Sequence, residues 1–182
     1  RPPGRLTGVD ARRLCARGRG IAVALLEEAI ELRDAGIHTP ILVMGGYYGD
    51  AEDELLAHDL SPVVYEASHF ERIARAAARA GRRANVHLKI DTGMSRLGVR
   101  PEGLAGLLET ARAFAAQVNV DGVMTHFASP DVAGEIGEES VHTQAALFRR
   151  CVEQIRAAGH TPRLVHGANS AAILRVDAAT QR

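Results

Sequence analysis

Short apolar runs alternate along the chain with longer stretches whose apolar positions recur at the spacing of an α-helix. Each apolar run is followed by a helical stretch, which is typical of strand–helix units in a parallel sheet. We therefore predict six strands, each followed by a helix. The predicted strands span residues 20–24, 40–44, 62–65, 85–90, 118–124 and 163–165.

The predicted helices carry recognisable start and stop signals. Gly36 and Gly81 end two of them, because glycine readily adopts the left-handed conformation that follows a helix. Ser68 is predicted to cap the start of the helix before Gly81, and Pro101 suits the first turn of the next helix. The predicted helices span residues 10–17, 26–35, 51–58, 68–80, 101–116 and 138–158, and a last one begins at Asn169 and Ser170.

This succession of strands and helices indicates an α/β fold with a parallel sheet and right-handed crossovers. Both an open doubly wound sheet and a closed (β/α)8 barrel have this pattern. The first predicted strand is not followed by Gly-x-Gly-x-x-Gly, which disfavours a dinucleotide-binding open sheet. A helix precedes the first predicted strand, so a strand before it is missing from the pattern. We predict a (β/α)8 TIM-type barrel, incomplete at both ends, whose first and last strands are missing or degenerate.

The composition of the chain argues against several classes of protein. The 182 residues suit one domain, and 46% hydrophobic with 24% charged residues is typical of a soluble globular protein. The net charge is zero, whereas nucleic-acid binding usually demands a basic face. We find no apolar run of membrane-spanning length and no signal-peptide block, and expect a cytoplasmic protein. Cys15 and Cys151 lack paired or metal-ligand spacing, so free thiols are expected.

Polar side chains follow three of the predicted strands, and barrels place functional residues at those carboxyl ends. Lys89 is the only lysine of the chain, and its amine can be shifted in pKa, carbamylated or made into a Schiff base. The eight histidines show no metal-ligand spacing, so no metal site is predicted. The three candidate groups are Lys89 with Asp91 and Arg96, Thr125 with His126, and His166 with Asn169 and Ser170.

Each group also has a purely structural interpretation. Lys89 could be a solvated surface lysine, and Asp91 could simply cap a turn through Gly93. His126 could be a half-buried histidine bonded to the backbone. Residues 169–170 could be an ordinary helix cap, although a helix start also offers free N–H groups to a phosphate.

Residues 87–98 read His-Leu-Lys-Ile-Asp-Thr-Gly-Met-Ser-Arg-Leu-Gly and closely resemble the Lys-x-Asp-Thr-Gly-Met-x-Arg-x-Gly signature of bacterial alanine racemases. Residues 122–128 are similar to the Thr-His-Phe-Ala segment of that family, and residues 166–172 to its His-x-x-Asn-Ser-Ala stretch. Residues 26–29 and 40–46 look like its second and third barrel units. The resemblance covers the chain from about Gly20 onward.

The resemblance implies an isomerase that uses pyridoxal 5'-phosphate to interconvert L- and D-alanine, supplying D-alanine for peptidoglycan. The full-length family member is expected to be a homodimer, with no nucleic-acid or membrane partner. Lys89 would be the lysine that members often carbamylate, and the carbamate would bond Arg96. Arg96 would interact with the phenolic oxygen of the cofactor and the substrate carboxylate. The implied cofactor contacts are His126 against the pyridine ring, His166 in the hydrogen-bond network beneath it, and Ser170 with Asn169 at the phosphate.

The chain departs from the family pattern at both ends. The family places its Schiff-base lysine in a Lys-Ala-x-Ala-Tyr-Gly-His-Gly segment, and alignment on Gly8 puts Arg1 at that lysine. An arginine cannot form a Schiff base. Residues 1–182 also lack the C-terminal β-domain, whose tyrosine is the opposite-face base. We therefore expect a partial N-terminal barrel domain that is inactive by itself.

Two alternatives stay open. One is a serine or broad-spectrum amino-acid racemase of the same fold, because the residues that would separate these substrates lie mainly in the β-domain. The other is a non-catalytic relative that binds pyridoxal phosphate or phosphate, which Arg1 motivates.

Overall fold

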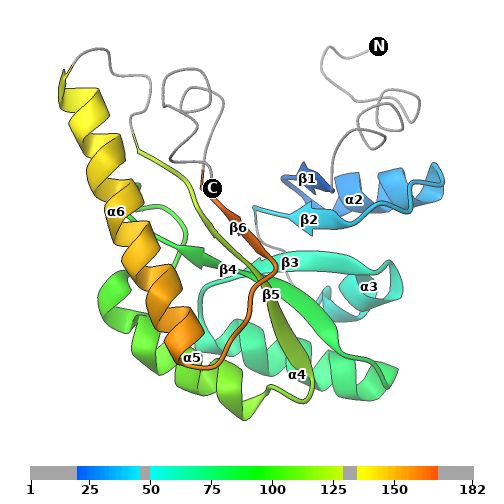
Figure 1. Ribbon diagram of the computed structural model, residues 1–182. Coiled ribbons are helices and arrows are strands. Elements are labelled where there is room, and N and C mark those ends of the chain that lie inside the picture. The colour runs from blue at the N-terminus through cyan, green and yellow to red at the C-terminus, as the bar shows by residue number, and fades with distance from the viewer. Residues whose placement is uncertain (1–19, 46–49, 129–134, 168–182) are drawn as a thin grey trace, which may run out of the picture.

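The computed structural model describes residues 20–45, 50–128 and 135–167 (Figure 1). Several predictions from the sequence lie outside these residues. They concern Arg1, the helix at residues 10–17, Cys15, and the helix start at Asn169 and Ser170. Among the described residues, no helix has both the length and the apolar character needed to cross a membrane.

The described strands form one sheet in which each strand pairs in parallel with the next one along the chain. Figure 1 shows this sheet curling into a half-barrel with helices on its outer side. The predicted α/β fold, an incomplete (β/α)8 barrel, is confirmed, and so are its six strands. The strands are β1 (Ile21–Val23), β2 (Ile41–Val43), β3 (Leu60–Val64), β4 (Ala84–Ile90), β5 (Val118–Thr125) and β6 (Leu164–His166).

The helices follow the predicted order but differ at several ends. The residue before the first turn of α4 is Glu66, so the predicted cap at Ser68 is wrong. Gly81 ends α4 with a φ of 63°, as predicted. Pro101 opens a short 3-10 turn, and the α-helix begins only at Leu104. The elements are α2 (Leu26–Asp34), α3 (Glu52–Ala57), α4 (Ala67–Ala80), η1 (Pro101–Gly103), α5 (Leu104–Ala113) and α6 (Glu135–Ala157).

Alternation along β4 separates the two faces of the sheet. Val86, Leu88 and Ile90 are fully buried in the main core, which the strands share with α4, α5 and α6. Fully burying a side chain of this size stabilises the fold by about 1.5–3 kcal/mol. The residues between them, His87 and Lys89, point to the inner face instead. They pair with residues of a separate inner cluster formed by Leu42, Val63 and Met124.

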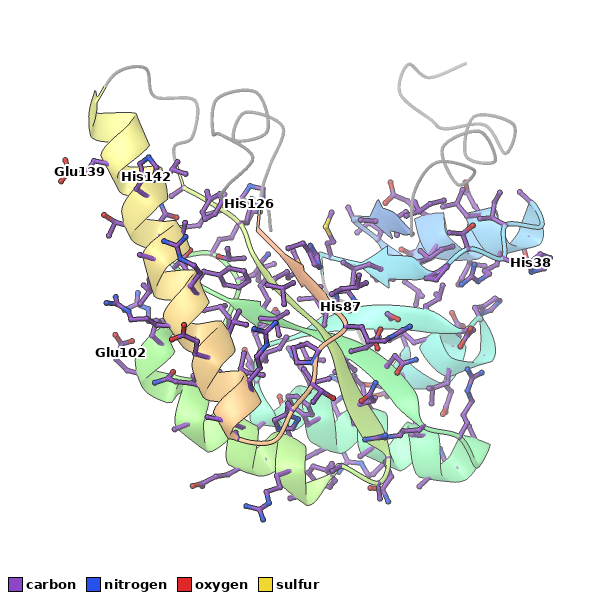
Figure 2. All side chains as sticks on the ribbon, viewed as in Figure 1. His38, His87, Glu102, His126, Glu139 and His142 are labelled. Atoms are coloured by element: carbon purple, nitrogen blue, oxygen red, sulfur yellow. The ribbon has the colours of Figure 1, made fainter. Side chains whose placement is uncertain are left out.

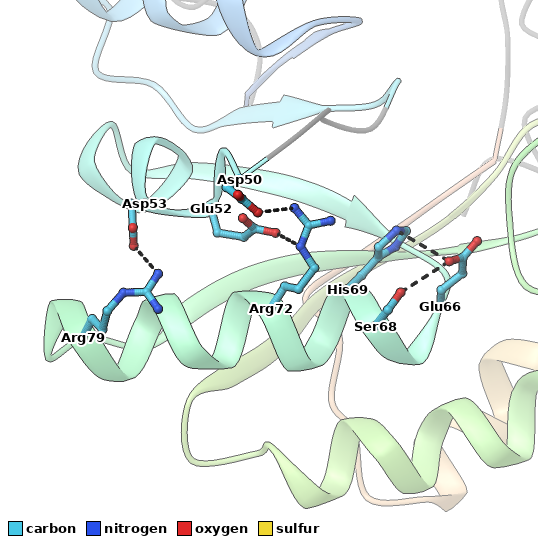
Figure 3. A network of polar contacts seen from close by, with 8 residues as sticks. All are labelled: Asp50, Glu52, Asp53, Glu66, Ser68, His69, Arg72 and Arg79. Carbon is cyan, nitrogen blue, oxygen red and sulfur yellow. Dashed lines mark hydrogen bonds and ion pairs between the residues drawn. The ribbon is translucent and has the colours of Figure 1, made fainter.

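Ion pairs fasten α3 to α4 on the outer side of the half-barrel (Figure 3). Arg72 Nε approaches Glu52 Oε1 to 2.5 Å, as an ion pair without hydrogen-bond alignment. Arg79 bonds Asp53 at 2.8 Å. The Glu66 carboxylate lies 3.9 Å from His69 at the start of α4. These contacts hold the helix that covers β4 and β5, and so they support the face opposite the candidate site.

Candidate functional site

The carboxyl ends of β4 and β5 bring Lys89, Arg96 and His126 together. Lys89 is the next-to-last residue of β4, and it pairs with Met124 of β5. His126 follows the last residue of β5 directly. Burial lowers the pKa of His126 most, and the charges of Lys89 and Arg96 lower it further, so the three side chains lie within electrostatic reach of one another. Two of the three groups predicted from the sequence therefore meet at one site.

Lys89 is buried, with 5% of its surface exposed, so the interpretation as a solvated lysine is wrong. Burial lowers the pKa of its ammonium, and the nearby Arg96 guanidinium lowers it further. Asp91 acts in the opposite direction but more weakly. A buried amine beside a guanidinium favours its neutral form, and the neutral form is the nucleophile.

The loop after β4 carries Arg96 and folds back on Lys89. Asp91 Oδ1 accepts hydrogen bonds from the N–H groups of Gly93 and Ser95, both at 3.0 Å. The backbone of Val99 then pairs with β4, donating to the carbonyl of Lys89 at 2.9 Å. The structural interpretation of Asp91 as a turn cap is confirmed. The turn presents Arg96, which is exposed, at the rim beside the buried lysine.

His126 is half-buried, as one of the two interpretations anticipated. Burial is the main cause that lowers the pKa of its imidazole, followed by the charges of Lys89 and Arg96. Lowering the pKa favours the uncharged ring. The flanking residues, Thr125 and Phe127, are both buried, which fixes the backbone on either side of this ring.

His166 ends β6 in register with Met124, and Met124 is in register with Lys89. Its side chain hydrogen-bonds His87, with 3.0 Å between His166 Nε2 and His87 Nδ1. Figure 2 shows His87 lying farther from the carboxyl ends of the strands than His126. His166 therefore lies on the inner face with the predicted site residues, but its bond is to a histidine one layer deeper.

His87, one layer below the candidate site, is a residue that sequence reasoning did not single out. It is buried, and burial lowers the pKa of its imidazole to about 4, with His166 as the next cause. The neighbouring strand makes room for the ring at Gly122, where a Cβ atom would come within 2.5 Å of it. One available signal was its position two residues before Lys89, which places both on the same face of the strand.

A bidentate ion pair lies below this pair of histidines. Arg163 donates from Nε to Asp121 Oδ1 at 2.6 Å and from Nη2 to Oδ2 at 2.7 Å. Asp121 is the extra residue of a bulge in β5, because the pairing with β4 skips from Val120 to Gly122. The bulge is what turns this carboxylate toward Arg163.

A cavity of about 710 Å³ opens toward the amino ends of the strands. His87, Asp121, Arg163 and His166 line it, but Lys89, Arg96 and His126 do not. Parallel barrels place their chemistry at the carboxyl ends of the strands. We therefore place the candidate site where the lysine, arginine and histidine converge, above this cavity.

Gln144 is a second residue that sequence reasoning did not single out. It lies on α6 and is buried, with 5% of its surface exposed. Its neighbours in the buried row of the helix are Val141, Ala145 and Phe148. A glutamine within an otherwise apolar helical row was the available signal, because a buried amide must find hydrogen-bond partners.

Three expectations about ligands and cysteines have different outcomes. Asn169 and Ser170 lie outside the described residues, so a phosphate site there stays a prediction. Over residues 20–45, 50–128 and 135–167, no three His, Cys, Asp or Glu side chains gather as a metal site would need. Cys151 is a buried free thiol, as expected.

Comparison with known proteins agrees with this geometry. The family described as "Alanine racemase, N-terminal domain" matches residues 8–181. An alanine racemase of Sorangium cellulosum is 49% identical over 164 residues, which cover 88% of this chain and 42% of that protein. The chain therefore spans less than half the length of this relative.

Solved structures show the same fold. An alanine racemase from Clostridium difficile 630 superposes with a TM-score of 0.84 at 32% identity, over 95% of this chain and 44% of that one. An alanine racemase from Bartonella henselae with covalently bound pyridoxal phosphate has a TM-score of 0.79 over 96% of this chain and 48% of that one. At 22% identity, the second likeness concerns the fold alone. Taken with the family match over residues 8–181, these findings show that the chain belongs to the alanine racemase N-terminal domain family.

Proposed function

We propose that the protein containing this chain is an alanine racemase that uses pyridoxal 5'-phosphate to interconvert L- and D-alanine. We further propose that it works in the cytoplasm as a homodimer and supplies D-alanine for peptidoglycan. The observation that carries the proposal is the convergence of Lys89, Arg96 and His126 at the carboxyl ends of β4 and β5 in a chain of this family.

The residues present fit the proposed cofactor. Arg96 offers a cation and a planar donor fork at the rim, which suits an anionic oxygen. The half-buried His126 has a lowered pKa, and an uncharged imidazole suits packing against an aromatic ring. Pyridoxal phosphate, when bound, makes the Cα proton of an amino acid acidic by withdrawing electrons from that carbon. Ser170 and Asn169 are proposed to hold its phosphate, and His166 to join the hydrogen bonds beneath its ring.

Lys89 is proposed to act as a carbamate. Burial lowers the pKa of its ammonium most, and repulsion between the ammonium and the Arg96 guanidinium lowers it further. The ammonium first gives up one proton, and the neutral amine then adds to the carbon of CO2. An N–C bond forms, one C–O π bond opens and a second proton is released, so that overall a cation becomes an anion. The repulsion then becomes an attraction, and the carbamate accepts hydrogen bonds from Arg96. That bond would orient the guanidinium toward a substrate carboxylate.

Assays of the full-length gene product test the function. It is incubated with pyridoxal phosphate and L-alanine, and the formation of D-alanine is measured by chiral chromatography. L-Serine and other L-amino acids run in parallel, because faster turnover of one of them would make the protein a racemase of different specificity. Residues 1–182 are assayed beside it, since their inactivity stays a prediction. Tight cofactor binding without any racemisation would contradict the proposal and indicate a non-catalytic relative.

A further inference from the structure

The side-chain amide of Gln144 pairs with one residue of the loop after β5. Its Oε1 accepts a hydrogen bond from the N–H of Ala128 at 2.9 Å. Its Nε2 donates to the carbonyl of Ala128 at 3.2 Å and to Ser140 Oγ at 3.0 Å. Both backbone groups of Ala128 are thus held by one side chain, as a neighbouring strand would hold them. Phe127 packs beside this clamp against Val141 and Ala145 of α6.

The same amide reaches the loop after β4. A Cβ atom at Gly93 would lie 3.4 Å from Gln144 Cδ, so the loop packs directly on the amide. Thr125 Oγ1 bonds the carbonyl of Ile90 at 2.9 Å, which uses its single proton. Thr92 must then donate to Thr125 across their 2.8 Å contact. Thr92 Oγ1 also lies 3.5 Å from Gln144 Oε1, and because its proton points to Thr125 this approach is a packing contact and not a hydrogen bond.

These contacts fix two loops relative to each other. One loop carries Arg96, four residues after Thr92, and the other carries His126, two residues before Ala128. We propose that Gln144 is a positioning residue that sets the placement of Arg96 relative to His126 through Ala128, Gly93 and the pair of threonines. The inference rests on the proposed racemase function, and it adds to that function a residue on α6 outside the three groups predicted from the sequence.

The chemistry of the clamp requires an amide. A methionine has a similar length and suits the apolar row, but its thioether sulfur accepts hydrogen bonds only weakly and cannot donate to the carbonyl of Ala128. A carboxylate accepts two hydrogen bonds and donates none, so it would face the carbonyl of Ala128 without a proton between them. When protonated, a carboxylic acid regains one donor. Burial favours that protonated form.

The test uses Gln144→Met and Gln144→Glu in the full-length holoenzyme, with Gln154→Met as the matched control. Gln154 lies on the same helix but is exposed. We expect Gln144→Met to lower kcat/KM by roughly tenfold or more, because small misplacements of catalytic groups have such effects. Hydrogen exchange of the Ala128, Gly93 and Ser95 amides should accelerate, while the amides of α6 keep wild-type protection. Gln154→Met should change neither quantity.

The pH profile separates positioning from a loss of packing. Activity of Gln144→Glu relative to wild type should rise as pH falls from about 8 to 6, because protonation restores a donor toward Ala128. Gln144→Met should show a constant ratio across the same range. Wild-type exchange and activity in Gln144→Met would overturn the proposal, and so would faster exchange spread evenly along α6. If the wild type forms no D-alanine, the proposed function fails, and the exchange of the loop amides still decides the role of Gln144 in holding the loops.

Discussion

At the scale of single residues, Lys89 shows how a position near the end of a strand can change the pKa of a side chain. Alternation along β4 sends it to the inner face, and the loop after β4 folds Arg96 back beside it. Burial and the guanidinium both lower the pKa of its ammonium. The pattern of apolar residues predicted where this lysine lies, but burial could not be predicted, because it depends on how the loop closes over the strand.

Lys89 should form a carbamate that can be observed directly. Residues 1–182 contain no other lysine, so apart from the terminal amine there is a single site. In ¹³C-labelled bicarbonate, we expect one carbamate signal by NMR besides that of the terminal amine, and it should grow as pH rises because the neutral amine is the nucleophile. Lys89→Ala should abolish this second signal and leave that of the terminal amine. An unchanged set of signals in Lys89→Ala, or only the signal of the terminal amine in the wild type, would contradict this assignment.

His87 should make the folded state sensitive to acid. Burial and His166 lower its pKa from 6.5 to about 4, so the unfolded chain takes up a proton at a higher pH than the folded chain does. The folded state is therefore destabilised as pH falls from 6.5 toward 4. The loss is on the order of 3 kcal/mol once pH lies below both values.

Urea unfolding of wild type and His87→Gln between pH 7.5 and pH 4 measures this effect. Other histidines also have lowered pKa values, so the informative quantity is the difference between the two proteins. The variant should lose less stability on acidification. Parallel pH profiles would show that His87 does not carry the effect.

At the scale of elements, β5 combines a bulge and a glycine to arrange the inner face. The bulge turns Asp121 toward Arg163, and Gly122 leaves the space that the ring of His87 fills. The sequence predicted β5 within one residue of its observed end, because the apolar run is continuous. Neither the bulge nor the use of Gly122 could be predicted, since both depend on the neighbouring strand.

Gly122→Ala should therefore destabilise the protein. A methyl group there would lie 2.5 Å from the ring of His87, which must move out of its bond with His166. Forcing extra volume into a packed place costs about 1–3 kcal/mol. Gly106→Ala on α5 is the control, because nothing lies within 4 Å of its added Cβ. It should stabilise the helix by about 0.5–1 kcal/mol. Thermal unfolding of both variants measures the contrast, and equal shifts in Tm would refute it.

Helix ends were predicted less well than strands, and α4 gives the reason. Serine is a common cap, yet the Ser68 hydroxyl lies 3.4 Å from the Glu66 carboxylate, inside a helix that has already started at Ala67. Pro101 likewise opens a turn of 3-10 helix before α5. Start signals that are spaced a residue or two apart compete locally, and helix ends are defined only to within about one or two residues.

At the scale of the whole molecule, the described sheet is strong at its centre and weak at its borders. β4 pairs with β5 along seven residues, and most of both strands is buried. β1 has three residues, of which one is buried, and β6 has three, of which none is fully buried. The candidate site depends mainly on the central pair, because Lys89 and His126 lie on or directly after it.

The difference in burial between the central and border strands predicts the order in which the strands of the 182-residue chain unfold locally. Amides that open only with global unfolding belong to the most buried strands, and those at the margins of a sheet exchange through local opening. We expect native-state hydrogen exchange to show the slowest amides at Val86, Leu88 and Val123 and far faster exchange in β1 and β6. Low concentrations of urea should leave the slowest amides unchanged and accelerate the border strands. Equal protection of the β1 and β4 amides would contradict this prediction. It would mean that the half-barrel unfolds as one cooperative unit, so that the candidate site is lost whenever β1 or β6 opens.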